Sequence, residues 1–175
     1  SGSILTSSDG ISWTSRESGS SKKLKGISYG NGLFVISGDS GTILTSSDNG
    51  TTWTSRTSGT SNNLSGNEFG NGLFVVAGNS GTILTSSDGT SWTSRTSGTS
   101  NNLRKIIFED ALFVVIGHSG TILTSSDGTT WNSRTSGTSE FLRGFTYANS
   151  TFVISGDSGT ILTSSVVTTW TERTS

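Results

Sequence analysis

Carboxylates recur at one place in a repeated segment of the chain. Four copies of the segment each carry an aspartate, namely Asp9, Asp48, Asp88 and Asp127. A set of carboxylates can hold metal ions or act as general acids. Each of these aspartates, however, follows a Ser-Ser pair and comes directly before Gly or Asn-Gly, a pattern that favours a tight turn in which the carboxylate accepts backbone N–H groups. We therefore interpret them as turn residues, and we expect no catalytic residue, no bound metal and no other cofactor.

A second candidate for chemistry is the tetrapeptide Gly-Asp-Ser-Gly, at residues 38–41 and 156–159. The same letters surround the nucleophile of serine proteases, but a nucleophilic serine needs a positioned base. The one histidine of the chain, His118, lies in the corresponding tetrapeptide of another copy. A polar turn explains the tetrapeptide without catalysis, and we expect the protein not to be an enzyme.

Arginine also recurs once in each copy of the segment. A charge on an outermost strand is a known guard against edge-to-edge pairing, and this is how we interpret the arginines. They are Arg16, Arg56, Arg95, Arg134 and Arg173.

The spacing of apolar residues defines the repeat. An isoleucine falls at residues 4, 43, 83, 122 and 161 and a tryptophan at residues 13, 53, 92, 131 and 170, so the period is 39 residues, with one step of 40. In the second period, short β-branched and aromatic runs at 24–29, 33–37, 42–46 and 52–56 alternate with Gly, Asn and Asp, which predicts consecutive hairpins. A four-stranded antiparallel meander of this length is typical of a β-propeller blade. We expect the tryptophans to be buried between blades.

The count of strands predicts one incomplete blade. The first two strands of the blade occur four times and the last two occur five times. We predict a single all-β propeller domain over 1–175, with a half blade at 1–17 and full blades at 22–57, 62–96, 101–135 and 140–174. Because a propeller closes its ring, the half blade either completes a five-bladed type of ring or pairs with another chain in a homo-oligomer.

The turn segment resembles a known family motif. Residues 46–53, Ser-Ser-Asp-Asn-Gly-Thr-Thr-Trp, are similar to the Asp-box of sialidase-type (BNR) propellers, and the whole period resembles the photosystem II assembly-factor group of propellers. The resemblance implies Asp-box blades whose boxes lie on the rim, away from the active face. In the fifth copy, Val166 and Val167 replace Asp and Gly. The repeated arginines and the two tyrosines, Tyr29 and Tyr147, do not reproduce the arginine triad and the tyrosine nucleophile of sialidases.

The composition excludes several classes of function. The net charge is −1, which leaves no basic face for nucleic acid. We expect no membrane-spanning segment and no signal peptide at Ser1. Cysteine is absent, so a disulfide framework and a thiolate metal site are excluded, while the cellular compartment stays open.

The copies differ mainly where one blade connects to the next and in the turn between the second and third strands. Both connections should emerge around the mouth of a propeller channel, and loops on a rigid scaffold often bind ligands. The predicted ligand-binding residues are Lys25, Ser65, Arg104, Arg143, Asp39, Asn79, His118 and Asp157. Their side chains suit a polar or anionic ligand, either a glycan or a protein.

Three functions are compatible with these patterns. The favoured one is a non-enzymatic scaffold for binding or protein interaction, with carbohydrate as one ligand class. The alternative is a recently amplified or designed repeat protein without a specific ligand, in which the loop differences are neutral. A sialidase-like glycan hydrolase is the least favoured.

Overall fold

The structure is a computed structural model that describes residues 2–174, and its regular elements are strands and two single-turn 3-10 helices. The strands of the first half are β1 (Ile4–Thr6), β2 (Thr14–Arg16), β3 (Leu24–Gly30), β4 (Leu33–Gly38), β5 (Ile43–Ser46), β6 (Thr54–Arg56), β7 (Leu64–Gly70), β8 (Leu73–Gly78), β9 (Ile83–Ser86) and β10 (Thr93–Arg95). Those of the second half are β11 (Leu103–Glu109), β12 (Leu112–Gly117), β13 (Ile122–Ser125), β14 (Asn132–Arg134), β15 (Leu142–Ala148), β16 (Thr151–Gly156), β17 (Ile161–Ser164) and β18 (Thr171–Glu172). The turns η1 (Asp39–Gly41) and η2 (Asp157–Gly159) follow β4 and β16. No helix of the described residues is long and apolar enough to cross a membrane.

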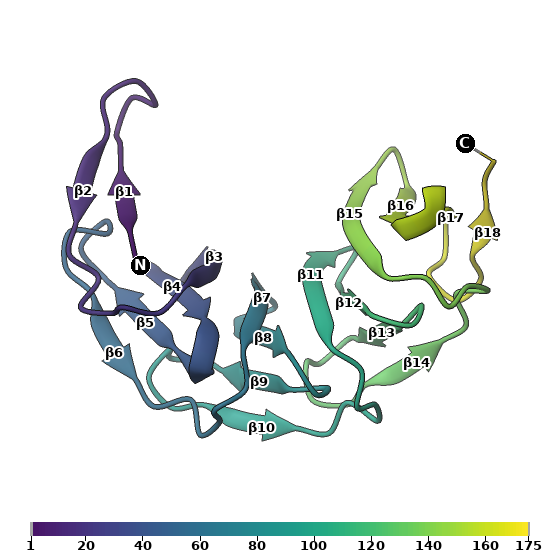
Figure 1. Ribbon diagram of the computed structural model, residues 1–175, viewed down its shortest axis with the longest axis horizontal. Helices are drawn as coiled ribbons and strands as arrows, with labels where there is room; N and C mark the ends of the chain where they lie inside the picture. The colour runs from purple at the N-terminus through teal and green to yellow at the C-terminus, as the bar shows by residue number, and fades with distance from the viewer. Residues whose placement is uncertain (1, 175) are drawn as a thin grey trace.

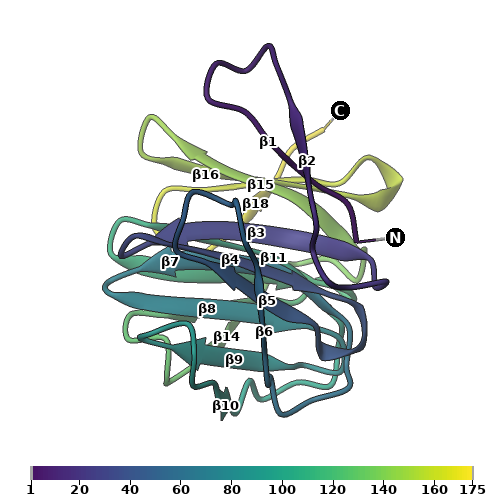
Figure 2. The ribbon, with the colours of Figure 1, turned by 90° about the vertical axis from the view of Figure 1, so that its left-hand side faces the viewer.

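The strands form propeller-like sheets, as the repeat predicts. Strands β3–β6, β7–β10, β11–β14 and β15–β18 make four four-stranded antiparallel sheets, and β1 and β2 make a separate two-stranded sheet. Figure 1 shows these sheets side by side around an open arc, with β3, β7, β11 and β15 innermost. The two ends of the chain lie on opposite arms of the arc, and Figure 2 shows the β1–β2 hairpin standing away from the stacked inner strands. Ring closure is not observed between the described strands and stays a prediction.

Apolar side chains on both faces of each sheet build the core. In β12, Phe113 and Val115 pack toward the preceding sheet, whereas Val114 and Ile116 pack toward the following one. Because side chains of a strand alternate between its faces, a continuous apolar run is buried on both sides when sheets cover both faces. The core is therefore a series of layers between neighbouring sheets, which holds the inner strands side by side.

The tryptophans lie in these layers, with one exception. Trp53, Trp92, Trp131 and Trp170 are half-buried against the preceding sheet, and the indole Nε1 of Trp53 donates to the Gly50 carbonyl at 3.0 Å. Trp13 is instead 60% exposed. The expectation that all five tryptophans are buried is wrong for Trp13, because none of the sheets formed by residues 2–174 packs on that side of β1 and β2.

The aspartates of the repeated turns are held by local hydrogen bonds. The Asp48 carboxylate accepts the Thr52 hydroxyl at 2.6 Å, the Thr52 N–H at 2.9 Å and the Ser46 hydroxyl at 2.7 Å. These bonds, led by the Thr52 hydroxyl, lower the pKa of Asp48 to about 2. Asp9, Asp88 and Asp127 make equivalent bonds within their own turns and have lowered pKa values too.

Candidate ligand-binding site

Each innermost strand contains a β-bulge near its start. Leu24 lies opposite Gly38 and Gly26 lies opposite Ser37, which leaves Lys25 as an extra residue on β3. The extra residues of β7, β11 and β15 are Ser65, Arg104 and Arg143. A bulge bends a strand and re-aims the side chain of its extra residue, and it is common beside functional sites. The bulges were not predicted from the sequence, although the recurring Leu-x-Gly at three of the four positions was a signal for them.

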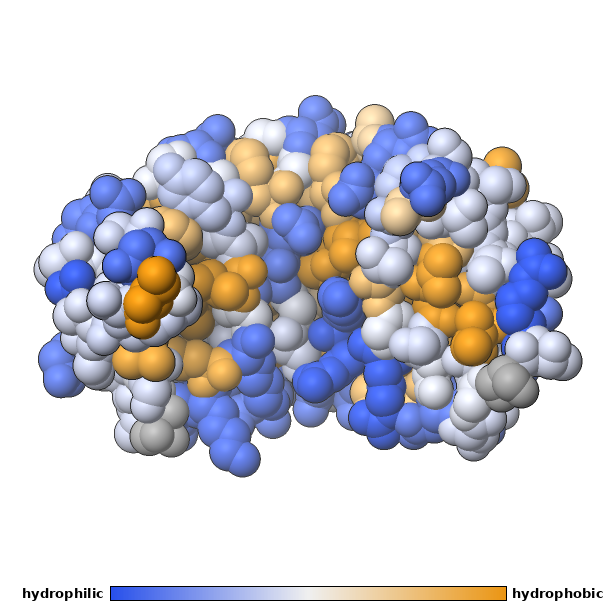
Figure 3. Space-filling view, turned by 90° about the horizontal axis from the view of Figure 1, so that it is seen from above, coloured by the Kyte–Doolittle hydropathy of each residue, from blue (hydrophilic) through white to orange (hydrophobic). Residues whose placement is uncertain are grey.

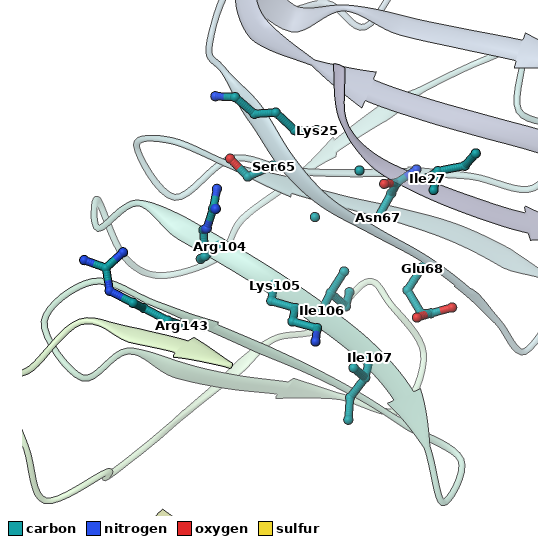
Figure 4. A pocket seen from close by; sticks show the side chains of 12 residues that line it. Lys25, Ile27, Ser65, Asn67, Glu68, Arg104, Lys105, Ile106, Ile107 and Arg143 are labelled. Carbon is teal, nitrogen blue, oxygen red and sulfur yellow. The ribbon is translucent and has the colours of Figure 1, made fainter. Parts of the chain in front are cut away.

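The bulges bring four predicted site residues to one hollow. Lys25, Ser65, Arg104 and Arg143 lie in a row across successive inner strands (Figure 4). The hollow has a volume of about 630 Å³, within the usual range of ligand pockets. Its wall also includes six residues that were not predicted from the sequence, namely Ile27, Asn67, Glu68, Lys105, Ile106 and Ile107.

The four predicted turn residues lie beside the hollow and do not line it. Asp39 forms an ion pair with Lys25, and Asp157 accepts a hydrogen bond from Nη2 of Arg143 at 2.8 Å. The Arg143 side chain thereby lowers the pKa of Asp157. The ring of His118 stacks on that of Phe141, with 3.7 Å between the ring centroids.

The fourth turn residue, Asn79, acts through its backbone. Its N–H donates to the Asn63 carbonyl at 2.8 Å, and the carbonyl of Asn79 accepts the Thr82 N–H at 3.1 Å. The turn residues thus fix the connections between sheets and neutralise Lys25 and Arg143 at the two ends of the row.

The centre of the row keeps its positive charge. Arg104 is exposed and forms no ion pair with any residue in 2–174. Beside it, Nζ of Lys105 donates to the Phe145 carbonyl at 3.0 Å, so the ammonium group is held at the wall of the hollow. A sequence signal for Lys105 existed, since it stands where the other inner strands have Gly26, Gly66 and Gly144.

One carboxylate shares the wall with these cations. Burial raises the pKa of Glu68, the nearby Glu109 carboxylate raises it further, and the Phe69 N–H bond and the Lys105 charge partly oppose the shift. In its ionised form Glu68 sets a negative charge against any anionic ligand in the hollow, and its raised pKa makes that charge easier to remove than the charge of an exposed glutamate.

The floor of the hollow is polar and internally bonded. Asn67 is buried, and its Nδ2 donates to the Val35 carbonyl at 2.7 Å while its Oδ1 accepts the Ser37 hydroxyl at 3.3 Å. These bonds join β7 to the preceding sheet. Asn67 thus has a structural role at a position where β11 and β15 carry Ile106 and Phe145.

The repeated arginines are not among the residues that line the hollow. Arg16, Arg56, Arg95 and Arg134 end the last strands of their sheets (Figure 1 shows these strands), and Arg173 directly follows β18. The Nε of Arg95 donates to the Thr85 hydroxyl on the neighbouring strand at 2.9 Å, and the other four arginines make the equivalent bond. They do not converge on a common point. In the described part of the chain, no group of three or more His, Asp or Glu side chains could hold a metal ion.

The comparisons with known proteins support the fold. No family model matches the sequence, and no curated protein matches it. Among solved structures, the chain is similar to YCF48 bound to D1 peptide, with a TM-score of 0.70 and 19% identity over 88% of this chain and 54% of that one. It is also similar to YCF48 from Cyanidioschyzon merolae, with a TM-score of 0.68 and 18% identity over 88% of this chain and 57% of the other. Trypanosoma rangeli sialidase has a TM-score of 0.56 and 13% identity, over 97% of this chain and 40% of that one.

The chain thus spans about half the length of the YCF48 chains and less of the sialidase. At these identities the likeness establishes a β-propeller type of scaffold made of repeated antiparallel sheets.

Proposed function

We propose that the protein is a non-enzymatic binding scaffold whose inner hollow takes an acidic segment of a partner polypeptide. The observation that carries the proposal is the row of bulge residues, at whose centre Arg104 forms no ion pair with a carboxylate of residues 2–174. A guanidinium group in that setting can form two parallel hydrogen bonds with a carboxylate. The ammonium group of Lys105, fixed beside it, adds a second positive charge.

The comparison with YCF48 favours a polypeptide over a glycan. One of the similar YCF48 structures has a peptide bound, so a scaffold of this fold can serve as a peptide receptor. The wall of the hollow also includes the half-buried side chain of Ile107, an apolar surface that suits the mixed side chains of a peptide.

The placement of the arginines argues against the sialidase alternative. Their guanidinium groups lie on the outer strands and bond to threonines of their own sheets. His118, the one candidate base for a Gly-His-Ser-Gly or Gly-Asp-Ser-Gly nucleophile, stacks on Phe141. We propose on this ground that the tetrapeptides form turns and that the protein has no hydrolase activity.

The test compares labelled probes in fluorescence anisotropy. We expect a fluorescein-labelled peptide of alternating Glu and Gly to bind, and neither its Lys-Gly counterpart nor labelled sialyllactose to do so. Arg104→Ala combined with Lys105→Ala should weaken binding of the acidic peptide by about tenfold or more, as expected for lost charged hydrogen bonds.

The matched control is Arg95→Ala combined with Arg134→Ala, which removes the same charge from the outer strands. It should leave the affinity within about twofold. Equal losses in the two double variants, or equal binding of acidic and basic peptides, would contradict a specific site. Failure of every probe to bind would favour the repeat protein without a ligand, and turnover of a fluorogenic sialoside would favour the hydrolase.

A further inference from the structure

The β1–β2 hairpin corresponds to the two outer strands of a four-stranded sheet, and in the described part of the chain no inner strands pair with it. Strand β1 pairs only with β2 among the described strands, so its other edge carries unpaired backbone N–H and C=O groups. Such an edge is a template for strand addition. Beside it, a cavity of about 220 Å³ lies between β1 and the next sheet, lined by Ile4, Leu5, Leu24, Ile27 and Ile36 among others.

The side chains around this gap are apolar and uncovered. Ile27 is 60% exposed, whereas Ile106, at the same position of β11, is 3% exposed because it packs in a cluster with Val75 and Ala77 of β8. Tyr29 is exposed as well, and Figure 3 shows hydrophobic atoms on both arms of the arc. In the other sheets, the two inner strands of the preceding sheet lie over the positions that Ile27 and Tyr29 occupy.

The C-terminal arm carries the matching half of the same interface. Each sheet has a forward face, which packs against the following sheet in the chain, and a backward face, which packs against the preceding one. Val114 and Ile122, for example, lie on a forward face and pack against the β15–β18 sheet. On that last sheet, Val153 and Ile161 hold the equivalent forward positions and are only half-buried. The two arms therefore present the two unpaired sides of an interface that the chain already forms three times between its four-stranded sheets.

The β1–β2 hairpin is a chemical equivalent of β17 and β18. Residues 1–8 and 158–165 differ only at Ser3 and Thr160. Leu5 corresponds to Leu162, but Leu5 is 58% exposed and Leu162 is 1% exposed. Thr6 of β1 corresponds to Thr163 of β17, and Thr163 lies opposite Val153 of β16. A β1 strand paired in the same register would therefore place Thr6 opposite Val153.

The resident pair β17–β18 differs from the other outer pairs in its turn. Two residue pairs join Thr171–Glu172 to β17, and the Arg173 N–H donates to the Ile161 carbonyl at 2.8 Å, so the pairing itself is as long as in the other outer pairs. Its turn lacks the aspartate, and Val167 has a φ of 51°, a left-handed conformation that is unfavourable for a β-branched residue. The turn of β1 and β2 keeps both Asp9 and Gly10.

We propose that two copies of this chain associate by strand exchange, in which the β1–β2 hairpin of one copy replaces β17 and β18 on strand β16 of the other. The exchange pairs the free edge of β1 and places Leu5 and Trp13 in covered positions. It also lays β15 and β16 of the second copy over Ile27 and Tyr29. After the exchange, each of the four inner strand pairs of a chain is completed by an outer hairpin whose turn contains the aspartate. Strands β17 and β18 no longer pair with β16. Because the joined surfaces differ, the contact is head-to-tail and can close only as a ring of copies.

Light scattering after size exclusion tests the association with the full chain. We expect a mass of twice 18.1 kDa at tens of micromolar protein. Leu5→Ser should raise the dissociation constant at least about tenfold, because burial of a leucine is lost in the complex but not in the monomer, where Leu5 is exposed. Ile11→Ser is the matched control, since the residues corresponding to Ile11 are exposed threonines in every other sheet, and it should leave the mass unchanged.

Cysteine pairing locates the contact, because the chain has no cysteine of its own. A mixture of a Thr6→Cys copy and a Val153→Cys copy should form a disulfide-linked dimer on a non-reducing gel. A mixture of Thr14→Cys and Val153→Cys should not, because Thr14 would lie one strand further away, beyond the reach of a disulfide.

Several outcomes would overturn the proposal. They are a monomeric mass up to several hundred micromolar, a dimer that tolerates Leu5→Ser, and cross-linking through Thr14 as readily as through Thr6. A Thr6→Cys, Val153→Cys double variant that forms only an intrachain disulfide would show closure within one chain instead. Restoring the weak turn by Val166→Asp and Val167→Gly should favour the monomer, and an increase in the dimer would equally contradict the exchange.

Discussion

The repeated aspartates act through backbone and hydroxyl hydrogen bonds inside their turns. Bonds from the Ser12 N–H and then the Ile11 N–H lower the pKa of Asp9 to about 2, and bonds led by the Thr52 hydroxyl lower that of Asp48 to about 2. A carboxylate whose pKa is lower in the folded state than in the unfolded chain stabilises the fold above its unfolded pKa, near 4. That contribution is lost as the pH falls toward 2.

We therefore expect the melting temperature to fall between about pH 4 and pH 2. Asp48→Asn should lower the melting temperature at pH 7 and also reduce its further fall at acid pH, because one titrating group with a lowered pKa is gone. Differential scanning calorimetry at several pH values measures both effects. Glu17→Gln, which removes an exposed carboxylate outside the turns, is the control and should reproduce the wild-type acid profile.

Glu68 should oppose anionic ligands in the hollow. Glu68→Gln removes a negative charge that interacts with Lys105, while it keeps a side-chain oxygen for the Phe69 N–H bond. The affinity for the acidic peptide at pH 7 should rise by about twofold to tenfold, the range of one screened charge interaction. An unchanged or weaker affinity in the variant would place the ligand outside this hollow.

At the scale of strands and turns, the sequence predicted the sheets because apolar residues and turn residues alternate with a fixed period. It also predicted eight residues around one opening, and the structure brings the four on the inner strands to one hollow, since equivalent positions of neighbouring sheets face the same side. It did not predict that Asp39 and Asp157 pair with Lys25 and Arg143, because the bulge that turns these side chains depends on pairing register. Glu68 was not predicted because its role depends on burial in the wall of the hollow, and Lys105 was not predicted although it replaces a glycine of the other inner strands.

The turn between β17 and β18 tests whether left-handed backbone at a β-branched residue destabilises the fold. Val167 has a φ of 51°, where the equivalent Gly89 and Gly128 have 68° and 69°. Left-handed backbone costs an L-residue roughly 1–2 kcal/mol, and a β-branched residue is especially disfavoured there. Val166→Asp with Val167→Gly should raise the melting temperature by about 2–4 °C, after allowance for the lost packing of Val167. Val166→Asp alone keeps the strained backbone and should gain less; a larger gain from this single change would contradict the role of strain.

At the scale of the whole molecule, the curvature of the arc depends on how closely neighbouring sheets approach. The Phe69 ring lies against Gly30 and the Phe108 ring against Gly70, where an added Cβ atom would overlap the ring. Equivalent positions further along the chain are Glu109 and Ala148, so the close approach is confined to the first two of the three interfaces. The curvature could not be predicted from the sequence. Gly30 and Gly70 also end strands before turns, so their presence alone does not indicate a close approach between sheets.

Gly70→Ala should therefore destabilise the interface between the β7–β10 and β11–β14 sheets by about 1–3 kcal/mol, the usual cost of overpacking. In a repeat protein each sheet is stabilised by its neighbours, so the loss should spread first to the adjoining sheets. Hydrogen exchange should show faster exchange in β7, β8, β11 and β12 and smaller changes in β15 and β16. Glu109→Ala shortens an exposed side chain at the equivalent position of β11 and should leave exchange unchanged. If both variants exchange alike, the glycine contact does not determine the spacing of the sheets, and the curvature must come from the apolar layers alone.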